Sequence, residues 1–253
     1  MQSHIQIPRS VLAEFVNEKK SFYKYNIENN KINIGYPKRT FTSENYYSVA
    51  MEKELNKHIE TPLKSLLELA RKMPTMELPI QFNKDILIIA RTYVKSLVAR
   101  SPSLFAHIGE KSAFLGLLPL QDRHDIVVDY AMKNEKISKF YDRFIMSFMI
   151  NETQVPFVLS TRGLYEYTLK EGLCLNVPLN PRCTILFEEK KTSEETLSFQ
   201  SSIVVIQSGY GDVVMKMNEC AMEKQYQEKV GYVVCQNRDI LRQLSEKYTA
   251  RRI

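Results

Sequence analysis

Hydrophobic and polar positions alternate near the start of the chain. Bulky and polar residues alternate over 22–27 (FYKYNI), Glu28-Asn29-Asn30 offers turn chemistry, and the alternation resumes over 31–34 (KINI). Two alternating runs joined by a short polar turn are typical of a β-hairpin. We therefore predict a hairpin in the N-terminal part of the chain.

The pattern then changes to the spacing of amphipathic helices. Ser43 is a candidate N-cap for a helix that runs to about His58. Thr61-Pro62 places a capping hydroxyl before a proline at a first helical position, and apolar residues recur at helical spacing up to 73. A further amphipathic helix is predicted over 83–99, where apolar residues line one broad face.

Beyond residue 99 helical and strand patterns follow one another. Two prolines and two glycines within 100–120 predict a loop with one short helix, and the apolar stripe over 122–150 predicts another helix. After Asn151, short runs rich in β-branched residues predict strands, and Asn218 and Asn237 are candidate caps of two more helices. The predicted strands are 155–159, 183–187, 203–207, 212–217 and 231–234.

Together these elements predict an α+β fold. A helical middle segment is expected to pack with a short-stranded, mainly antiparallel sheet and an N-terminal β-hairpin. Residues 190–202 (KKTSEETLSFQSS) are polar and predict an exposed loop. Because no proline-rich, serine-rich or repetitive stretch interrupts the chain, residues 1–253 are predicted to form a single domain.

Composition narrows the class of protein. The 253 residues are 44% hydrophobic and 25% charged, as in an ordinary soluble globular protein. The apolar runs are too short to cross a bilayer, and the first twenty residues lack a secretory signal, so we predict a cytoplasmic protein without a membrane partner. Eight glycines are about 3% of the chain against a usual ~7%, which counts against glycine-rich phosphate loops.

The four cysteines predict no metal centre. Cys174, Cys183, Cys220 and Cys235 lie 9, 37 and 15 positions apart, which provides no paired short chelate. Reduced, buried thiols are the expected state in a cytoplasmic protein. No signature of a dinucleotide-binding loop, a P-loop, a zinc protease or a serine hydrolase is present, and no cofactor is predicted.

Positive charge has a local excess near the N-terminus. The net charge is +6, and residues 1–40 carry seven lysines and arginines against three glutamates, an excess of 7 − 3 = +4. Aromatic residues such as Tyr23 and Tyr25 stand among these cations, and cations neutralise phosphates while aromatic rings stack on bases. A nucleic acid or an acidic protein is therefore the predicted partner, and a solvated basic face is the alternative. The candidate binding residues are Arg9, Lys19, Lys20, Lys24, Lys38 and Arg39.

A second functional class, an enzyme, stays open. His4, Glu60 and His124 are the candidate acid–base residues of a hydrolase acting on nucleic acid. A metal-dependent nuclease needs several carboxylates that converge on one or two metal ions, and sequence spacing does not show such convergence. Asp125 and Asp129 are one helical turn apart beside His124, where carboxylates usually serve the helix dipole.

Several of these segments resemble, in order, a family of mainly bacterial proteins that share the domain of unknown function DUF4238. Its members open with His-x-x-Pro followed by a Leu and a Phe. Here His4 and Pro8 stand one residue further apart, and Leu12 and Phe15 follow. An aromatic hairpin strand comes next in the family, as it does at 22–25 in this chain.

The resemblance continues over nearly the whole chain. Its further segments are the helix around Glu54, Ile59 and Glu60, the Arg100-Ser101-Pro102 turn, the 157–160 strand, the 177–181 turn, and Asn218, Ala221, Val233 and Val234. Where the family tends to place Ser-Asp-x-Pro after a strand, this chain has Ser160-Thr161-Arg162-Gly163. A threonine carries no charge to hold a cation, so a shared metal-dependent activity is not expected. By analogy with this family, a role in phage defence is one hypothesis.

Overall fold

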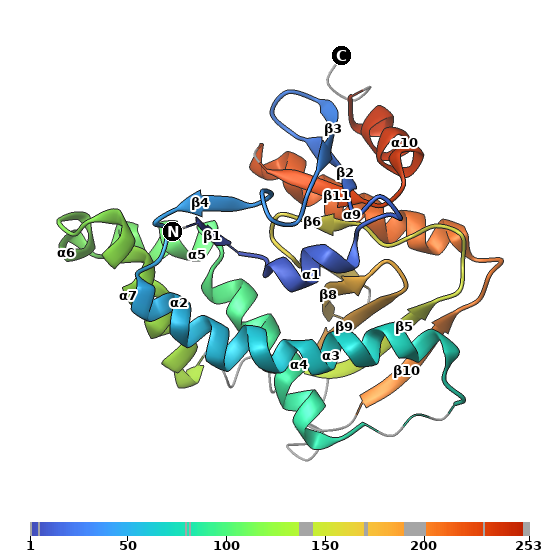
Figure 1. The fold of residues 1–253 in the computed structure, drawn as a ribbon, viewed down its shortest axis with the longest axis horizontal. Helices are drawn as coiled ribbons and strands as arrows, with labels where there is room; N and C mark the ends of the chain where they lie inside the picture. Colours follow the sequence, from blue (N-terminus) through green and yellow to red (C-terminus); the bar gives the residue numbers. More distant parts are fainter. Residues whose placement is uncertain are drawn as a thin grey trace.

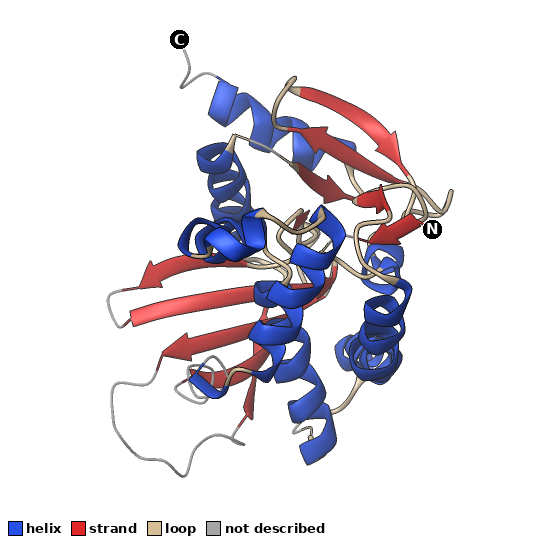
Figure 2. Ribbon diagram, turned by 90° about the vertical axis from the view of Figure 1, so that its left-hand side faces the viewer, coloured by secondary structure: helices blue, strands red, loops and turns tan. Residues whose placement is uncertain are grey.

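Helices are concentrated in the middle of the chain, and strands lie at both ends of it (Figure 1), which confirms the α+β class. The computed structural model describes residues 2–4, 6–78, 80, 82–136, 144–169, 172–189, 201–229 and 231–249. In Figure 2 the larger sheet lies at the lower left of the molecule, and the smaller sheets lie above it. In the described part of the chain, no helix has the length and apolar character that a membrane span requires.

The N-terminal half of the chain contributes most of the two smaller sheets. β1 (Gln2–His4) pairs antiparallel with β4 (Thr42–Glu44). The four-stranded sheet has the order β3-β2-β11-β6. Its strands are β2 (Phe22–Asn26), β3 (Lys31–Gly35), β6 (Leu159–Ser160) and β11 (Tyr232–Cys235). The predicted hairpin is thus confirmed as β2 and β3, paired from Phe22–Gly35 to Asn26–Lys31.

The five-stranded sheet has the order β10-β5-β9-β8-β7, and only the β10–β5 pair is parallel. Its strands are β5 (Phe144–Asn151), β7 (Tyr165–Leu169), β8 (Gly172–Asn180), β9 (Cys183–Glu189) and β10 (Ser201–Ile206). The prediction of a mainly antiparallel, short-stranded arrangement is confirmed.

Helices cover both faces of this larger sheet, and others pack on these helices or on the four-stranded sheet. They are α1 (Arg9–Glu14), α2 (Val49–Leu55), α3 (Thr61–Lys72), α4 (Lys84–Ala99), α5 (Pro102–Lys111), α6 (Ala113–Gly116), α7 (Leu120–Lys133), α9 (Gly211–Glu228) and α10 (Arg238–Thr249). A π-helical turn, η1 (Asn56–Glu60), joins α2 to α3, and a short 3₁₀ turn, η2 (Met73–Thr75), follows α3.

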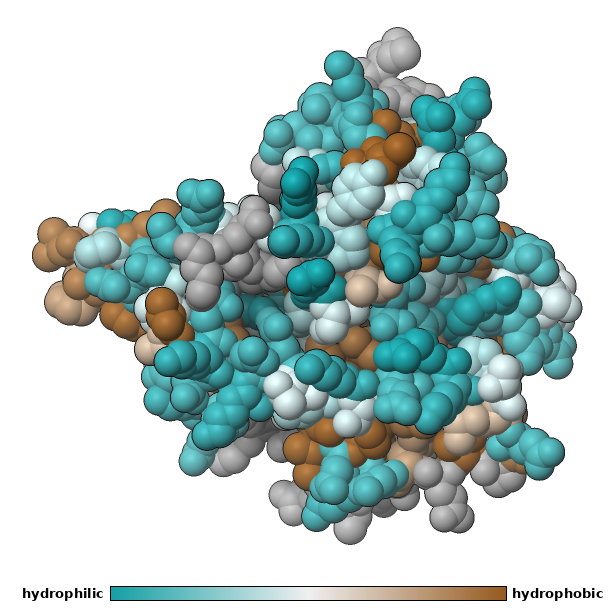
Figure 3. Space-filling view, viewed as in Figure 1, coloured by the Kyte–Doolittle hydropathy of each residue, from teal (hydrophilic) through white to brown (hydrophobic). Residues whose placement is uncertain are grey.

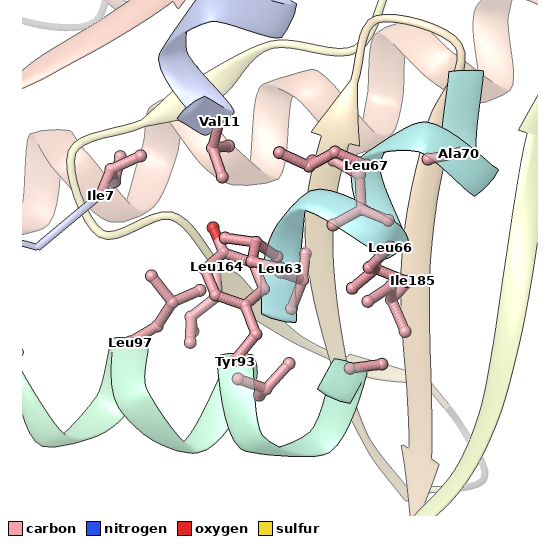
Figure 4. Packing of buried hydrophobic residues seen from close by; sticks show 14 of the residues in the cluster. Ile7, Val11, Leu63, Leu66, Leu67, Ala70, Tyr93, Leu97, Leu164 and Ile185 are labelled. Atoms are coloured by element: carbon pink, nitrogen blue, oxygen red, sulfur yellow. The ribbon is translucent and has the colours of Figure 1, made fainter. Parts of the chain in front are cut away.

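Two apolar clusters hold these layers together. In the first, side chains of α1, α3 and α4 pack against one face of the five-stranded sheet, and Figure 4 shows Leu66 of α3 beside Ile185 of β9. In the second, α9 and α10 pack against the four-stranded sheet and the opposite face of the larger one. Burial of these side chains supplies the main favourable term of folding.

Several predicted elements are confirmed. Strands form at 183–187, at 231–234 apart from Gly231, and at 203–207 apart from Gln207. Asn83 caps α4, and the Asp239 N–H donates to Asn237 Oδ1 at 2.8 Å at the start of α10.

The helix predicted from Ser43 begins later. Ser48 is the N-cap of α2 and accepts from the Met51 N–H at 3.1 Å, whereas Ser43 belongs to strand β4. β4 pairs with residues 2–4, which lie forty positions earlier, so local spacing gives no sign of this strand.

The sequence predicts one helix that ends near His58 and a second that begins at Thr61-Pro62. The structure has no interruption between them, because the backbone stays helical through η1. The Thr61 N–H donates to the carbonyl of Asn56, five residues earlier. Pro62 has no N–H and its ring would clash with the carbonyl four residues before it, so the wider π-helical turn accommodates a proline that an α-helical turn would not.

The predictions for 100–120 and 122–150 were partly wrong. The first range contains two helices, α5 and α6, since the Ser101 hydroxyl accepts from the Leu104 N–H at 3.3 Å and starts α5. The second contains α7 and then strand β5, while residues 137–143 lie outside the described residues. β5 is buried on both faces, and such a strand has the same apolar run as a buried helix.

The strand predicted at 212–217 is wrong, because these residues begin α9. Asn218 is not a cap but a buried residue within this helix: its amide donates to the Pro156 carbonyl at 2.8 Å and accepts from the Val158 N–H at 3.0 Å. These bonds hold residues 156–158 in an irregular buried segment, so the strand predicted at 155–159 shrinks to β6.

The turn expected at 177–181 is also displaced. Residues up to Asn180 belong to β8, and Pro178 is accommodated at an irregularity in the pairing of β8 with β9.

Residues 190–200 of the predicted polar loop lie outside the described residues, and Ser201 already belongs to β10. The division of the chain into one domain stays a prediction.

The cysteines are free thiols, and Cys174, Cys183 and Cys235 are buried as expected, while Cys220 is half-buried. Burial raises the pKa of Cys183 and of Cys235 to about 12, so both thiols stay protonated at neutral pH.

Candidate functional site

The four-stranded sheet brings three loops to one of its ends. Phe22, the first residue of β2, lies opposite Gly35 at the end of β3, and Tyr23 lies opposite Cys235 at the end of β11. Because neighbouring strands of this part of the sheet are antiparallel, the segments 15–21, 36–41 and 236–237 meet at the same end.

These loops carry a cluster of exposed cations, which we name the basic end. Its members are Lys19, Lys20, Lys38, Arg39 and Arg238. Around them, the surface formed by β2, β3 and α10 is mostly hydrophilic, in contrast to the apolar tip near α6 (Figure 3). The apolar tip exposes Phe114, Leu117 and Leu120.

A tight turn presents the two lysines before β2. The side-chain oxygen of Asn17 accepts from the N–H groups of Lys19 at 3.0 Å and Ser21 at 3.3 Å, and the Lys20 N–H donates to the Asn17 carbonyl at 2.9 Å. Lys20 has a φ of 56°, in the left-handed region. The asparagine thus fixes the backbone from which both cations project into solvent.

A groove of about 660 Å³ opens beside this turn and the start of α10. Tyr23, Asn17 and Asn237 line it, so an aromatic ring and two amides stand close to Lys19. Glu18 and Asp239 also line the groove and balance the charges of Lys19 and Arg238. The excess positive charge of the basic end therefore comes from Lys20, Lys38 and Arg39.

Lys24 lies on the face of the sheet rather than at its end. Its Nζ is 4.9 Å from the ring centroid of Tyr232, and that ring is 5.8 Å from the ring of Phe41. The ammonium group is thus held over an aromatic face by a cation–π interaction. Arg9 is exposed at the start of α1 and is set back from the loop 15–21 by the length of that helix, about 9 Å.

Glu60, the predicted acid–base residue, lies in the π-helical turn near Arg100. Burial raises the pKa of Glu60, the Arg100 charge opposes this shift, and Glu52 adds to it. The Arg100 side chain is only 3% exposed, and it donates long hydrogen bonds to Ser96, at 3.4 Å to the carbonyl and 3.5 Å to the hydroxyl.

Three buried polar atoms near this position have no hydrogen-bond partner among the described residues. They are Glu52 Oε1, the Tyr93 hydroxyl and Arg100 Nη1, and with Glu60 these residues form what we name the Arg100 cluster. Figure 4 shows Tyr93 surrounded by apolar side chains such as Ile7, Leu97 and Leu164. Unpaired buried polar groups are rare in folded proteins, and a catalytic role is one of the explanations for them.

His124 lies apart from this cluster. It is 5% exposed and stacks on Tyr46 with 3.7 Å between ring centroids, and its Nδ1 is 3.2 Å from the Tyr46 carbonyl oxygen. Burial lowers the pKa of His124, so the imidazole is neutral at physiological pH. For the side chains that the structure describes, no hydrogen bond or ion pair joins His124 to Glu60.

The backbone of His4 pairs with that of Thr42 in the β1–β4 ladder, and its side chain lies outside the described part of the structure. The structure therefore does not assemble His4, Glu60 and His124 into one acid–base arrangement in the part of the chain that it describes.

The carboxylates beside His124 have structural partners. Asp125 accepts from the Ser48 N–H at 3.2 Å, at the start of α2, and Asp129 forms an ion pair with Lys133 at 2.7 Å. Over the described ranges, no group of three or more His, Cys, Asp or Glu side chains is arranged to hold a metal ion.

Sequence reasoning missed Arg238 and Tyr232 as neighbours of the basic residues. Both depend on the pairing of β11 with β2, which joins segments about two hundred positions apart. Glu52 and Tyr93 had no distinguishing signal, since each occupies an ordinary position in a helical pattern.

Comparisons of the chain with protein-family models, with curated proteins and with solved structures gave no match. The resemblance to the DUF4238 family stays a prediction that rests on the order of its short motifs.

Proposed function

We propose that the protein binds single-stranded nucleic acid at the basic end of its four-stranded sheet. The observation that carries this proposal is the convergence of three loops, which brings five exposed cations to one end of the sheet. Two of them, Lys19 and Arg238, line a groove together with Tyr23 and two asparagines. Single-stranded nucleic acids are bound by cations that follow the backbone and by aromatic rings that stack on the bases.

The chemistry of the groove favours a nucleic acid over an acidic protein. Lysines and arginines alone would suit either partner, because both carry negative charge. Tyr23 adds a stacking surface, and the amides of Asn17 and Asn237 add donors and acceptors of the kind that contact base edges and sugars. An acidic protein partner is therefore the alternative outcome of the binding test.

Fluorescence polarisation with labelled single-stranded RNA, single-stranded DNA and duplex DNA tests the proposal. The charge-reversal variant K19E/K20E/K38E/R39E should weaken binding of the single strands by about 10-fold or more. K53E/K57E is the control, because both lysines are exposed on α2 and the π-helical turn after it, and α2 lies apart from β2, β3 and α10 in Figure 1. Absence of binding at low salt, or equal loss in both variants, would reject the proposal.

A second candidate function, hydrolysis of nucleic acid, is favoured by one specific observation. Glu60 lies in a rare π-helical turn, its pKa is raised by burial, and two unpaired polar atoms, Arg100 Nη1 and the Tyr93 hydroxyl, lie near it. A carboxyl group with a raised pKa beside a cation suits general acid–base catalysis. Incubation of labelled oligonucleotides with the protein, with and without divalent cations, tests this function; cleavage that the E60Q variant abolishes supports it, and cleavage that E60Q retains excludes Glu60.

A further inference from the structure

The strand β10 forms one border of the five-stranded sheet. It pairs with β5 on one side only, from Ser201–Met146 to Ile206–Asn151. On the other side of β10, the described ranges contain no strand that pairs with it. A strand at the border of a sheet presents unpaired N–H and C=O groups to its surroundings.

The direction of these groups follows from one hydrogen bond. The Glu152 N–H donates to the Ile206 carbonyl at 3.0 Å, so this carbonyl is directed toward the β5 side. Backbone groups alternate between the two sides of a strand, which places those of Ser202 and Val204 on the β5 side as well. The N–H and C=O groups of Ser201, Ile203 and Val205 therefore point outward from the sheet.

Two other sheet borders have protection of a kind that is not seen along β10 in the described residues. Strand β3 carries Lys31 within its five residues, and α9 packs against β7. Charged residues and covering elements prevent border strands from pairing with other chains. In contrast, the sequence from 201 to 211 (SSIVVIQSGYG) contains no charged residue and no proline.

We propose that β10 pairs antiparallel with β10 of a second copy of this chain, about a two-fold axis at Ile203. In this register Ile203 lies opposite its own counterpart, and Ser201 lies opposite Val205. The three outward-facing residues of each strand then exchange hydrogen bonds in pairs, and the two sheets become one continuous sheet.

The absence of charge on β10 is the reason to propose a second copy of this chain, and not a charged partner, as the chain that pairs with it. Two copies of an uncharged strand meet across a two-fold axis without bringing like charges together, whereas a charge near the axis would approach its symmetry mate. This strand has none, and its β-branched residues suit pairing with one another. Ser202 of one copy would lie opposite Val204 of the other. In the single chain Val204 is 40% exposed.

Light scattering during size-exclusion chromatography over a range of protein concentrations tests this dimer. The full chain should have twice its monomer mass at high concentration, and the S202K/V204K variant should be a monomer, because four like charges would gather at the axis. Both residues are exposed in the single chain, but the Ser202 hydroxyl is 2.7 Å from that of Ser147, so circular dichroism checks that the variant keeps the fold. V49K is the control, since Val49 is 59% exposed on α2 and its substitution should leave the dimer unchanged.

Hydrogen exchange gives an independent readout. A peptide covering 201–206 should exchange more slowly at high protein concentration in the unmodified chain, and not in S202K/V204K. A monomer at every concentration, a dimer that survives in S202K/V204K, or assemblies larger than a dimer would each overturn the proposal.

Discussion

Thr161 and Tyr232 are joined by hydrogen bonds through both backbone groups of the tyrosine. The Thr161 hydroxyl accepts from the Tyr232 N–H at 2.6 Å and donates to the Tyr232 carbonyl at 3.0 Å. The Thr161 N–H donates to the same carbonyl at 2.9 Å. Thr161 thus has a structural role in this chain, because its hydrogen bonds fix the start of β11.

Substitution of Thr161 by valine should destabilise the fold by about 1–3 kcal/mol, because the Tyr232 N–H loses its acceptor in a half-buried position. T161S retains the hydroxyl and should cost less. Urea unfolding followed by circular dichroism measures both free energies. A T161V variant as stable as the unmodified protein, with a loss confined to T161S, would show that the methyl group, and not the hydroxyl, is the stabilising part of this side chain.

Gly163 should tolerate no side chain. Its φ is +72°, and an added Cβ would lie 2.8 Å from a methyl carbon of Leu97 in the core. The G163A variant combines left-handed strain of about 1–2 kcal/mol with this overlap, so its free energy of unfolding should fall by at least that amount. G116A is the control, since nothing lies within 4 Å of a Cβ at that position. Thermal unfolding of the two variants at one pH provides the comparison.

The stability of the protein should depend on the protonation of Glu60. Burial raises the pKa of this carboxyl group in the folded state above its usual value of about 4.5, so folding favours the protonated form. The stabilisation is complete below 4.5 and is lost as the pH rises through the raised pKa. E60Q stays neutral, so its free energy of unfolding should improve relative to the unmodified protein between about pH 4 and about pH 8. A constant difference across this range would contradict a buried, ionising Glu60.

The contribution of His124 to stability should change with pH in the opposite direction to that of Glu60. Burial lowers the pKa of its imidazole below 6.5, so its contribution is present above that value and is lost as the pH falls through the lowered pKa. H124F keeps an aromatic ring to stack on Tyr46 but does not titrate. From about pH 8 to about pH 5, the unmodified protein should therefore lose stability relative to H124F. Chemical denaturation at each pH measures this difference, and a gain in its place would show that the imidazolium is stabilised.

Local patterns predicted the parts of the fold that depend on neighbours in sequence. The hairpin of β2 and β3 and the cap at Asn237 were evident because their interactions span only a few residues. Strand β4 was missed since its partner lies forty positions away, and β5 resembled a helix because both of its faces are buried.

The candidate site was predictable to a similar extent. Lys19, Lys20, Lys38 and Arg39 stand out as basic residues in the sequence, but only the pairing of β11 with β2 adds Arg238 to them. Glu60 was chosen for its residue type, yet its setting depends on Arg100, forty positions later and on another helix. Such long-range proximity comes from tertiary packing, which no local pattern encodes.

Tyr23 should contribute to binding through its ring. Base stacking on an aromatic side chain is worth about 1–3 kcal/mol per base, so Y23L should weaken single-strand binding while Y23F should not. Leucine keeps an apolar side chain at a half-buried position, which limits the loss of stability. Polarisation titrations with a short labelled RNA measure both variants. Equal affinities of Y23L and the unmodified protein would place the bases away from this groove.

The salt dependence of single-strand binding tests the central claim most directly. The dissociation constant for one labelled oligonucleotide would be measured between about 50 and about 200 mM salt for the unmodified protein, for K38A/R39A and for K53A/K57A. If phosphates bind at the basic end, the slope of log affinity against log salt should become shallower by about 1 for each phosphate-binding cation that K38A/R39A removes, and should stay unchanged in K53A/K57A. Binding that does not depend on salt, or identical slopes in all three proteins, would contradict a nucleic-acid interface at the basic end.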